Sequence, residues 1–321
     1  MAQERDAVNL FENILVAVDL AEGDLLVSNG GPPHSQHAVQ EALWLAKGIG
    51  AKLTFFHSLD ISEHAQWLIT ECHLENNVRD QALESLQRMV DRAAAEGIQA
   101  DCAVTFGRSW LQIIRKAVQG NYDLVIAGTR HQSQLRSVLF GSTGMKLLRK
   151  CPTPVWLTHP REHRGLRSVV VATDLSEVSN RVVDMAAGVA GQYGAQLHLV
   201  HVINPGTTQE LRGIGLPLMR IEEHQKNERE RAEKGLAEQV ERPAVKALPQ
   251  PPNVILATGE PDEVILKTLE DLKADLLVMA TLARSGIPGM VIGNTAERLL
   301  PHLRCSVLAV KPAEFVTPVT L

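Results

Sequence analysis

The stretch NILVAVDL at residues 13–20 decides the fold, because it returns as SVVVATDL at residues 168–175. Two more stretches are repeated in the same order: YDLVIAGT at 122–129 as ADLLVMAT at 274–281, and LRKCP at 148–152 as HLRCS at 302–306. A repeat of this length is the size of a domain and far exceeds the period of a solenoid or a propeller. The chain is therefore expected to contain one fold twice.

Composition excludes several classes of protein. The 321 residues suit two domains of ordinary size, and 45% hydrophobic residues can fill two cores. A formal net charge of −5 without a Lys/Arg cluster argues against a nucleic-acid partner. Four cysteines, none in a CxxC pair, argue against a disulfide framework and structural zinc. No apolar run is long enough to span a bilayer and no leader pattern is recognisable, so we expect no membrane partner and a cytoplasmic protein.

Short runs rich in Val, Ile and Leu, without polar alternation, are typical of parallel strands covered on both faces. In the first half they predict strands over residues 8–19, 52–58, 98–106, 123–128 and 154–157. Apolar residues at helical spacing predict helices over 35–48, 64–96 with a break near 76–77, 110–118 and 141–150. The second half repeats this order, with strands near 168–173, 196–202, 253–258, 275–280 and 306–310, and helices near 178–192, 219–241, 261–272 and 294–302.

Strands that alternate with helices over short links predict an α/β protein. We expect two tandem, open, twisted five-stranded parallel sheets with helices on both faces, in domains 1–158 and 167–321. In the second domain, residues 204–218 are predicted to form a loop. Its apolar side chains either belong to an ordinary excursion or line or cover an apolar pocket. They are Leu211, Ile214, Leu216, Leu218 and Met219.

Open sheets of this kind bind ligands outside the carboxyl ends of their strands, where the winding direction reverses. Asp19 and Asp174 end the first strands of the two halves, and the loops beginning at Thr129 and Thr281 follow the fourth strands. The predicted site therefore lies at this edge of each sheet. Each aspartate has a second interpretation, as a residue that turns or caps the chain after its strand.

The stretch ATLARSGIPGMVIGNTAE at 280–297 resembles the signature region of the universal stress protein family. The first half carries a weaker relative, GTRH at 128–131 followed by GST at 141–143. The resemblance covers nearly the whole chain twice, as in tandem two-domain members. It implies a Rossmann-like, nucleotide-binding type of fold and a stress-response function.

Many members of the family bind ATP through Gly, two residues, Gly, nine residues, Gly, then Ser or Thr. Glycine lets the backbone approach a phosphate, and the start of a helix favours an anion. The first half fits this pattern at Gly128, Gly141 and Ser142, whereas His131 stands at the second glycine position.

The second half fits the pattern at Gly293, with Asn294 at the Ser/Thr position and Thr295 next. Ala280 and Ala283 replace the first two glycines. Where such a position needs a positive φ, alanine is strained by about 1 kcal/mol or more.

The resemblance implies ATP or ADP, with Mg²⁺, as the ligand, and the second half is expected to hold it. Gly293, Asn294 and Thr295 would hold the phosphates and Arg284 would offset their charge. Thr173 and Asp174, like Asp19 in the first half, would lie on the adenosine side.

Three functions remain open. The first is an adenine-nucleotide sensor without fast turnover. The second is an interaction or scaffold protein, or a binder of an apolar ligand, on the same fold. The third is an ATP hydrolase, although the chain has no P-loop, GxGxxG, HExxH or GxSxG motif and no recognisable base. No catalytic residue and no metal ligand is therefore predicted.

Several matching residues have structural interpretations. Arg130 and Arg284 would be solvated loop charges, and His57 and His201 would satisfy the ends of the second strands. Cys151 and Cys305 would be small core residues. The family's strand order places the fifth strand at the edge of the sheet, which predicts pairing of fifth strands. This gives self-association, as a pseudo-dimer within the chain and a homodimer between chains.

Overall fold

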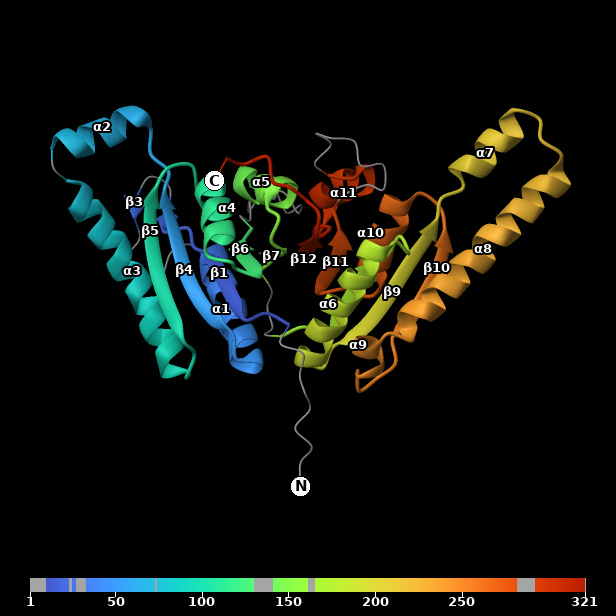
Figure 1. The fold of residues 1–321 in the computed structure, drawn as a ribbon, viewed down its shortest axis with the longest axis horizontal. Coiled ribbons are helices and arrows are strands. Elements are labelled where there is room, and N and C mark those ends of the chain that lie inside the picture. The colour runs from blue at the N-terminus through green and yellow to red at the C-terminus, as the bar shows by residue number, and fades with distance from the viewer. Residues whose placement is uncertain are drawn as a thin grey trace, which may run out of the picture. The chain divides into compact units, whose positions relative to one another are not determined.

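The computed structural model describes residues 10–22, 25–26, 33–72, 74–129, 141–160, 165–281 and 292–320. The chain divides into two compact units (Figure 1). The first contains Met1–His163 and Ala313–Leu321, and the second contains Arg164–Pro312. The last nine residues, which the sequence places in the second domain, thus belong to the first unit. Thr317 Oγ1 donates to the Lys150 carbonyl over 2.8 Å, and Arg115 Nε donates to the Thr320 carbonyl over 3.0 Å.

The first unit contains a five-stranded parallel sheet in the order β7-β6-β1-β4-β5, with a short antiparallel pair β2-β3. Its strands are β1 (Asn13–Ala17), β2 (Ala21–Glu22), β3 (Leu25–Leu26), β4 (Lys52–Leu59), β5 (Ala100–Phe106), β6 (Leu124–Gly128) and β7 (Val155–Thr158). Its helices are α1 (Pro33–Ile49), α2 (Glu63–Glu71), α3 (Glu75–Ala95), α4 (Ser109–Gln119) and α5 (Ser142–Lys150).

The second unit repeats this sheet in the order β10-β9-β8-β11-β12, again parallel throughout. Its strands are β8 (Ser168–Ala172), β9 (Gln196–Ile203), β10 (Asn253–Thr258), β11 (Leu276–Ala280) and β12 (Ser306–Val310). Its helices are α6 (Glu177–Tyr193), α7 (Gly206–Gly213), α8 (Leu218–Val240), α9 (Pro243–Lys246), α10 (Pro261–Asp271), α11 (Asn294–Leu299) and the 3-10 turn η1 (Leu300–His302). The predicted fold class, two tandem parallel α/β sheets, is confirmed.

The central strands are buried on both faces because they consist of apolar residues without alternation. In β1, Ile14, Leu15 and Val16 are fully buried, and in β8 Val169, Val170 and Val171 are. Right-handed crossovers then place helices on both sides of each sheet. In the first unit α1 packs on β1 and β6 and α3 on β4 and β5, while α4 contacts α5; in the second unit α6 packs on β8 and β11, and α10 contacts α11.

Two aspartates tie the amino edges of the sheets in the same way. The Asp123 carboxylate accepts hydrogen bonds from the backbone of Glu12 (2.7 Å) and Asn13 (3.1 Å). Asp275 accepts from the backbone of Arg167 (2.6 Å) and Ser168 (3.1 Å). Each bond satisfies a backbone donor next to the start of a central strand. This edge is the opposite one from the predicted site.

Some predicted boundaries are wrong. Residues 204–218 contain α7 and are therefore not entirely a loop. In the long helical stretch of the first unit, α2 ends at Glu71 and α3 already begins at Glu75, so the helix does not break at 76–77. A helix forms over 206–213 despite its flanking glycines, because Pro205 begins it and the Asn204 side chain accepts a hydrogen bond from the Gly206 backbone (2.8 Å).

Candidate functional site

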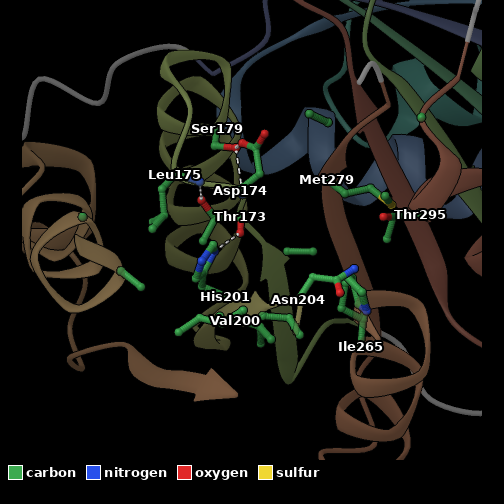
Figure 2. A pocket seen from close by; sticks show the side chains of 18 of the residues that line it. Thr173, Asp174, Leu175, Ser179, Val200, His201, Asn204, Ile265, Met279 and Thr295 are labelled. Atoms are coloured by element: carbon green, nitrogen blue, oxygen red, sulfur yellow. Dashed lines mark hydrogen bonds between the residues drawn. The ribbon is translucent and has the colours of Figure 1, made fainter. Parts of the chain in front are cut away.

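The second unit contains a cavity of about 940 Å³ at the carboxyl ends of β8, β9 and β11. Figure 2 shows side chains of its lining, which comes from six parts of the chain. They are residues 172–175 with Ser179; residues 200–204; one side of α8; Pro261 with Ile265; Met279 with Ala280; and residues 293–296. From β8 the chain winds to β9 on one side and β11 lies on the other, so the cavity sits where the winding direction reverses.

Asp174 lies at the mouth of this cavity and joins the start of α6. Its Oδ1 accepts hydrogen bonds from the Ser176 backbone (3.0 Å), the Ser176 hydroxyl (2.5 Å) and the Ser179 hydroxyl (2.5 Å). Ser176 is the N-cap of α6 and also accepts from the Ser179 backbone. Asp174 therefore has the structural role of capping and turning the chain after its strand, because its carboxylate holds the turn between β8 and α6 together.

Leu175, the residue between Asp174 and the N-cap, has a left-handed backbone with φ of 61°. Its backbone N–H donates to Thr173 Oγ1 over 3.1 Å. A non-glycine residue pays of order 1 kcal/mol for this conformation and keeps it only where its surroundings enforce it. Here the Asp174 network fixes the turn and Leu175 packs against Gly235 of α8.

A histidine closes the end of the second strand in each unit. His201 Nδ1 lies 2.8 Å from the Thr173 carbonyl oxygen (Figure 2), and His57 Nδ1 lies 2.8 Å from the Val18 carbonyl oxygen. Burial lowers the pKa of His57, although its bond to Val18 and the nearby Asp19 oppose the change. Both rings bridge neighbouring strands, which is the structural role predicted for them.

The inner wall of the cavity is apolar. Val200 of β9, Met279 of β11 and Ile265 of α10 converge there (Figure 2), and Met279 is only 4% exposed. Ala232 of α8 contributes the facing side. A cavity with an apolar wall and polar groups at its mouth is the usual form of a small-molecule site.

Ala280 and Gly293 line the cavity together, with Asn294 and Thr295 beginning α11. Ala280 is the last residue of β11 and has the extended backbone of that strand, and Gly293 has φ of −72°. The strain expected for an alanine at position 280 is therefore absent. The Gly293 backbone donates to the Thr281 carbonyl over 3.0 Å, which ties the start of α11 to the end of β11.

The α8 side of the cavity carries four charged residues that the sequence did not single out: Glu228, Arg231, Lys234 and Glu238. Buried Ala232 and Leu236 mark the inward face of α8, and Glu228 lies one turn before Ala232 on that face. Glu228 also pairs with His224 at 3.5 Å. The sequence did contain a signal for Glu228, because this residue interrupts the apolar stripe on the inward face of α8 where an apolar residue is expected.

The predicted residues of the first unit occupy matching places. The Asp19 backbone donates to Ser35 Oγ over 2.9 Å, Gly128 ends β6, Gly141 is the N-cap of α5 and Ser142 begins it. Gly141 has φ of −54°, so a positive φ is not the reason for a glycine at this position. Four predicted residues lie outside the described part of the chain: Arg130, His131, Ala283 and Arg284.

The apolar residues around α7 do not line the cavity. Ile214, Leu218 and Met219 are 75%, 68% and 74% exposed, and only Asn204 of that segment reaches the lining. These three residues are therefore not part of the second-unit cavity lining. In the first unit Trp67, Leu68 and Leu74 occupy the matching segment, between the second strand and the long helix, and are exposed as well.

Cys151 and Cys305 are buried, as predicted. Among the described residues, no group of three His, Cys, Asp or Glu side chains could hold a metal ion. In the same part of the chain, no helix is long and apolar enough to cross a membrane.

The duplicated parallel sheet, with helices on both faces and a cavity at its switch point, defines a tandem α/β protein of the doubly wound type. The universal stress protein family matches residues 10–159 and 165–311, and the chain belongs to this family. It is similar to Universal stress protein E of Escherichia coli strain K12, with 27% identity covering 97% of this chain and 98% of that one. Universal stress protein E of Photorhabdus laumondii is 25% identical, covering 96% and 98%.

Solved structures agree with this fold. A universal stress protein from Archaeoglobus fulgidus DSM 4304 superposes with a TM-score of 0.62 at 20% identity, covering 93% of this chain and 98% of that one. A functionally unknown protein from Pseudomonas aeruginosa PAO1 gives a TM-score of 0.66 at 20% identity, covering 97% and 96%. At this identity the likeness concerns the fold.

Proposed function

We propose that this tandem universal stress protein binds an adenine nucleotide, ATP or ADP, in the cavity of the second unit and acts as a cytoplasmic sensor rather than an enzyme. One observation carries the proposal. Six residues predicted for the nucleotide site line the same cavity: Thr173, Asp174, Ala280, Gly293, Asn294 and Thr295. Its volume of about 940 Å³ suits a ligand of nucleotide size.

The charges around the cavity support binding of a nucleotide together with Mg²⁺. Arg231 and Lys234 offer two cations, but Asp174, Glu228 and Glu238 place three carboxylates on the same lining. A bare polyphosphate is repelled by carboxylates at short range, whereas a magnesium-bound one carries less negative charge. We therefore expect affinity to fall when Mg²⁺ is removed by a chelator.

The test is a calorimetric titration of the full chain with Mg-ATP and Mg-ADP. Ala280→Phe places an aromatic ring at the strand end that opens into the cavity, and we expect it to abolish binding. Gly128→Ala is the matched control, because Gly128 ends β6 as Ala280 ends β11. Saturating ligand at about 100 times its Kd should stabilise the second unit by about 2.7 kcal/mol. Absence of saturable binding at millimolar nucleotide, or equal binding by Ala280→Phe, would refute the proposal.

A second candidate is an interaction protein of the same fold that no longer binds nucleotide. The occupied Asp174 Oδ1 and the two glutamates of α8 favour it, since both features weaken an anion site. The exposed apolar residues at the matching α2–α3 and α7–α8 segments offer contact surface for a partner protein. The two candidates separate in a thermal melt, because Mg-ATP raises the midpoint only for the sensor.

A further inference from the structure

The first unit contains a second cavity, of about 560 Å³, between β5 and α4. Its base consists of Phe56 of β4 and residues 103–105 of β5, and its side is formed by four residues of α4: Gln112, Arg115, Lys116 and Gln119. None of the residues predicted for nucleotide binding belongs to this lining. The cleft is therefore separate from the carboxyl-edge site of that unit.

The chemistry of this lining is one-sided. It contains a guanidinium, an ammonium, two carboxamides and the Thr105 hydroxyl, and it contains no carboxylate. Arg115 Nε donates to the Thr320 carbonyl at 3.0 Å, and a guanidinium has four further N–H donors. Among the ion pairs formed between described residues, none involves Arg115 or Lys116. A partly buried cleft with two unneutralised cations and several hydrogen-bond donors attracts an oxyanion.

The second unit supplies an internal comparison, because α10 matches α4 residue for residue. Both helices have 11 residues, both follow a glycine with positive φ (Gly107 and Gly259), and both precede a left-handed residue (Asn121 and Lys273). The matching positions of the four cleft residues are Val264 for Gln112, Lys267 for Arg115, Thr268 for Lys116 and Asp271 for Gln119.

In α10 the cation is neutralised within its own helix. Lys267 Nζ donates to Asp271 Oδ2 over 2.6 Å, and this hydrogen bond raises the pKa of Lys267. The Thr268 hydroxyl donates to the Val264 carbonyl over 2.7 Å instead of facing a ligand. The first unit has lost the carboxylate, gained a second cation and gained an amide at the same positions. The same four helix positions are thus charge-neutral in the second unit and cationic in the first.

We propose that the β5–α4 cleft of the first unit binds a small multivalent oxyanion, as found in phosphorylated or polycarboxylate metabolites. Arg115 takes one anionic group through paired N–H donors, and Lys116 contributes a point charge beside it. Gln112, Gln119 and Thr105 complete the donor set around the remaining oxygens. This site gives the first unit an anion site of its own, separate from the nucleotide cavity proposed for the second unit.

The experiment follows tryptophan fluorescence at low ionic strength during titration with pyrophosphate and, separately, with citrate. All four tryptophans lie in the first unit, and Trp110 belongs to the same helix as the cleft residues, so the signal reports on the first unit. Tighter binding of pyrophosphate assigns the phosphorylated class, and tighter binding of citrate assigns the polycarboxylate class. The titrations are repeated with the Ala280→Phe variant, which blocks the second-unit cavity. The fluorescence change on adding each anion is expected to be the same as in the unaltered chain.

Three variants make the result specific. Arg115→Gln removes the main donor, and Gln119→Asp installs the carboxylate that neutralises α10; each is expected to weaken binding by about tenfold or more. Lys267→Gln is the matched control and should bind like the unaltered chain. An unchanged melting transition shows that each variant folds. No saturable binding of either probe at about 10 mM, or equal loss in Lys267→Gln, would overturn the proposal.

Discussion

His57 Nδ1 lies 2.8 Å from the carbonyl oxygen of Val18, in a ring that is only 6% exposed. Because a carbonyl oxygen only accepts, the ring donates through Nδ1 whether it is neutral or charged. Burial penalises the charged form and lowers the pKa of His57 from 6.5. The folded first unit therefore holds fewer protons than its unfolded chain just below that pH. Its stability is complete above about pH 6.5 and is lost as the pH falls from 6.5 through the lowered pKa.

The first prediction follows from the direction of this pKa shift. Urea unfolding of the first unit, followed by tryptophan fluorescence, should show lower stability at about pH 5.5 than at about pH 7.5. His57→Gln keeps an N–H donor for Val18 and should flatten this dependence. His201→Gln changes the matching bond of the second unit and leaves the tryptophan signal as it was. An equally steep pH dependence in His57→Gln would contradict the assignment.

The second prediction separates the two roles of Asp174. Asp174→Asn weakens the charge-assisted bonds from Ser176 and Ser179, so the start of α6 should lose about 1–2 kcal/mol in the absence of any ligand. Ser179→Ala removes one of those donors and should cost about 1 kcal/mol. Because the two changes remove one shared bond, the double variant should lose less than the sum. Hydrogen exchange of the α6 amides measures each variant.

If Asp174→Asn leaves α6 exchange unchanged but abolishes Mg-ATP binding, the carboxylate serves the ligand rather than the turn. Loss of both would assign both roles to the same residue. The comparison matters because a binding defect in Asp174→Ala alone could arise from a disordered turn.

Much of this fold could be predicted from the sequence because the central strands have no polar alternation. β8 and β11 consist almost wholly of buried apolar residues, so their positions along the chain follow from the hydrophobic pattern. The edge of the sheet that carries the candidate site could also be predicted from the sequence, since Asp174 and Thr281 lie at the carboxyl ends of predicted strands. The helix α7 was missed because Pro205 and the glycines around it read as loop signals, while a side chain at Asn204 and a proline start favour a turn of helix.

Two charged cavity residues, Arg231 and Lys234, could not be predicted from periodicity. Arg231 and Lys234 belong to the polar side of a long amphipathic helix, which the pattern assigns to solvent. They line a cavity only because α8 passes beside the ends of β8 and β9. Likewise, Arg115 reads as an ordinary surface charge until its match Lys267 is seen paired with Asp271. Comparing the two halves position by position was the signal that could have found it.

The third prediction concerns Gly235, which leaves room for Leu175. A Cβ at position 235 would lie 3.1 Å from Leu175 Cδ1, tighter than ordinary contact. Gly235→Ala should be nearly neutral, because a gain of about 1 kcal/mol in helix propensity offsets a small shift of a flexible side chain. Gly235→Val should cost about 1–3 kcal/mol by overpacking. Leu175→Ala should relieve most of that cost in the double variant, measured by calorimetric melting.

The fourth prediction concerns the anchor that holds the cavity-lining helix. Arg242, just after α8, donates through Nε to Asp184 Oδ1 of α6 over 2.7 Å and contacts Oδ2 through Nη2. This paired bond raises the pKa of Arg242. Beside it, Gln239 Nε2 donates to Asn180 Oδ1 over 3.2 Å. Together these contacts hold the end of α8 against α6.

Arg242→Lys keeps the charge but loses the paired geometry, and should destabilise the second unit by about 1 kcal/mol. Amide exchange along α8 should rise, since this end of the helix is released, while the tryptophan transition of the first unit stays in place. Lys267→Gln, which alters a fully exposed ion pair within α10, is the matched control and should leave stability nearly unchanged. If both variants behave alike, the Arg242–Asp184 pair is an ordinary surface contact and α8 is held by its apolar face alone.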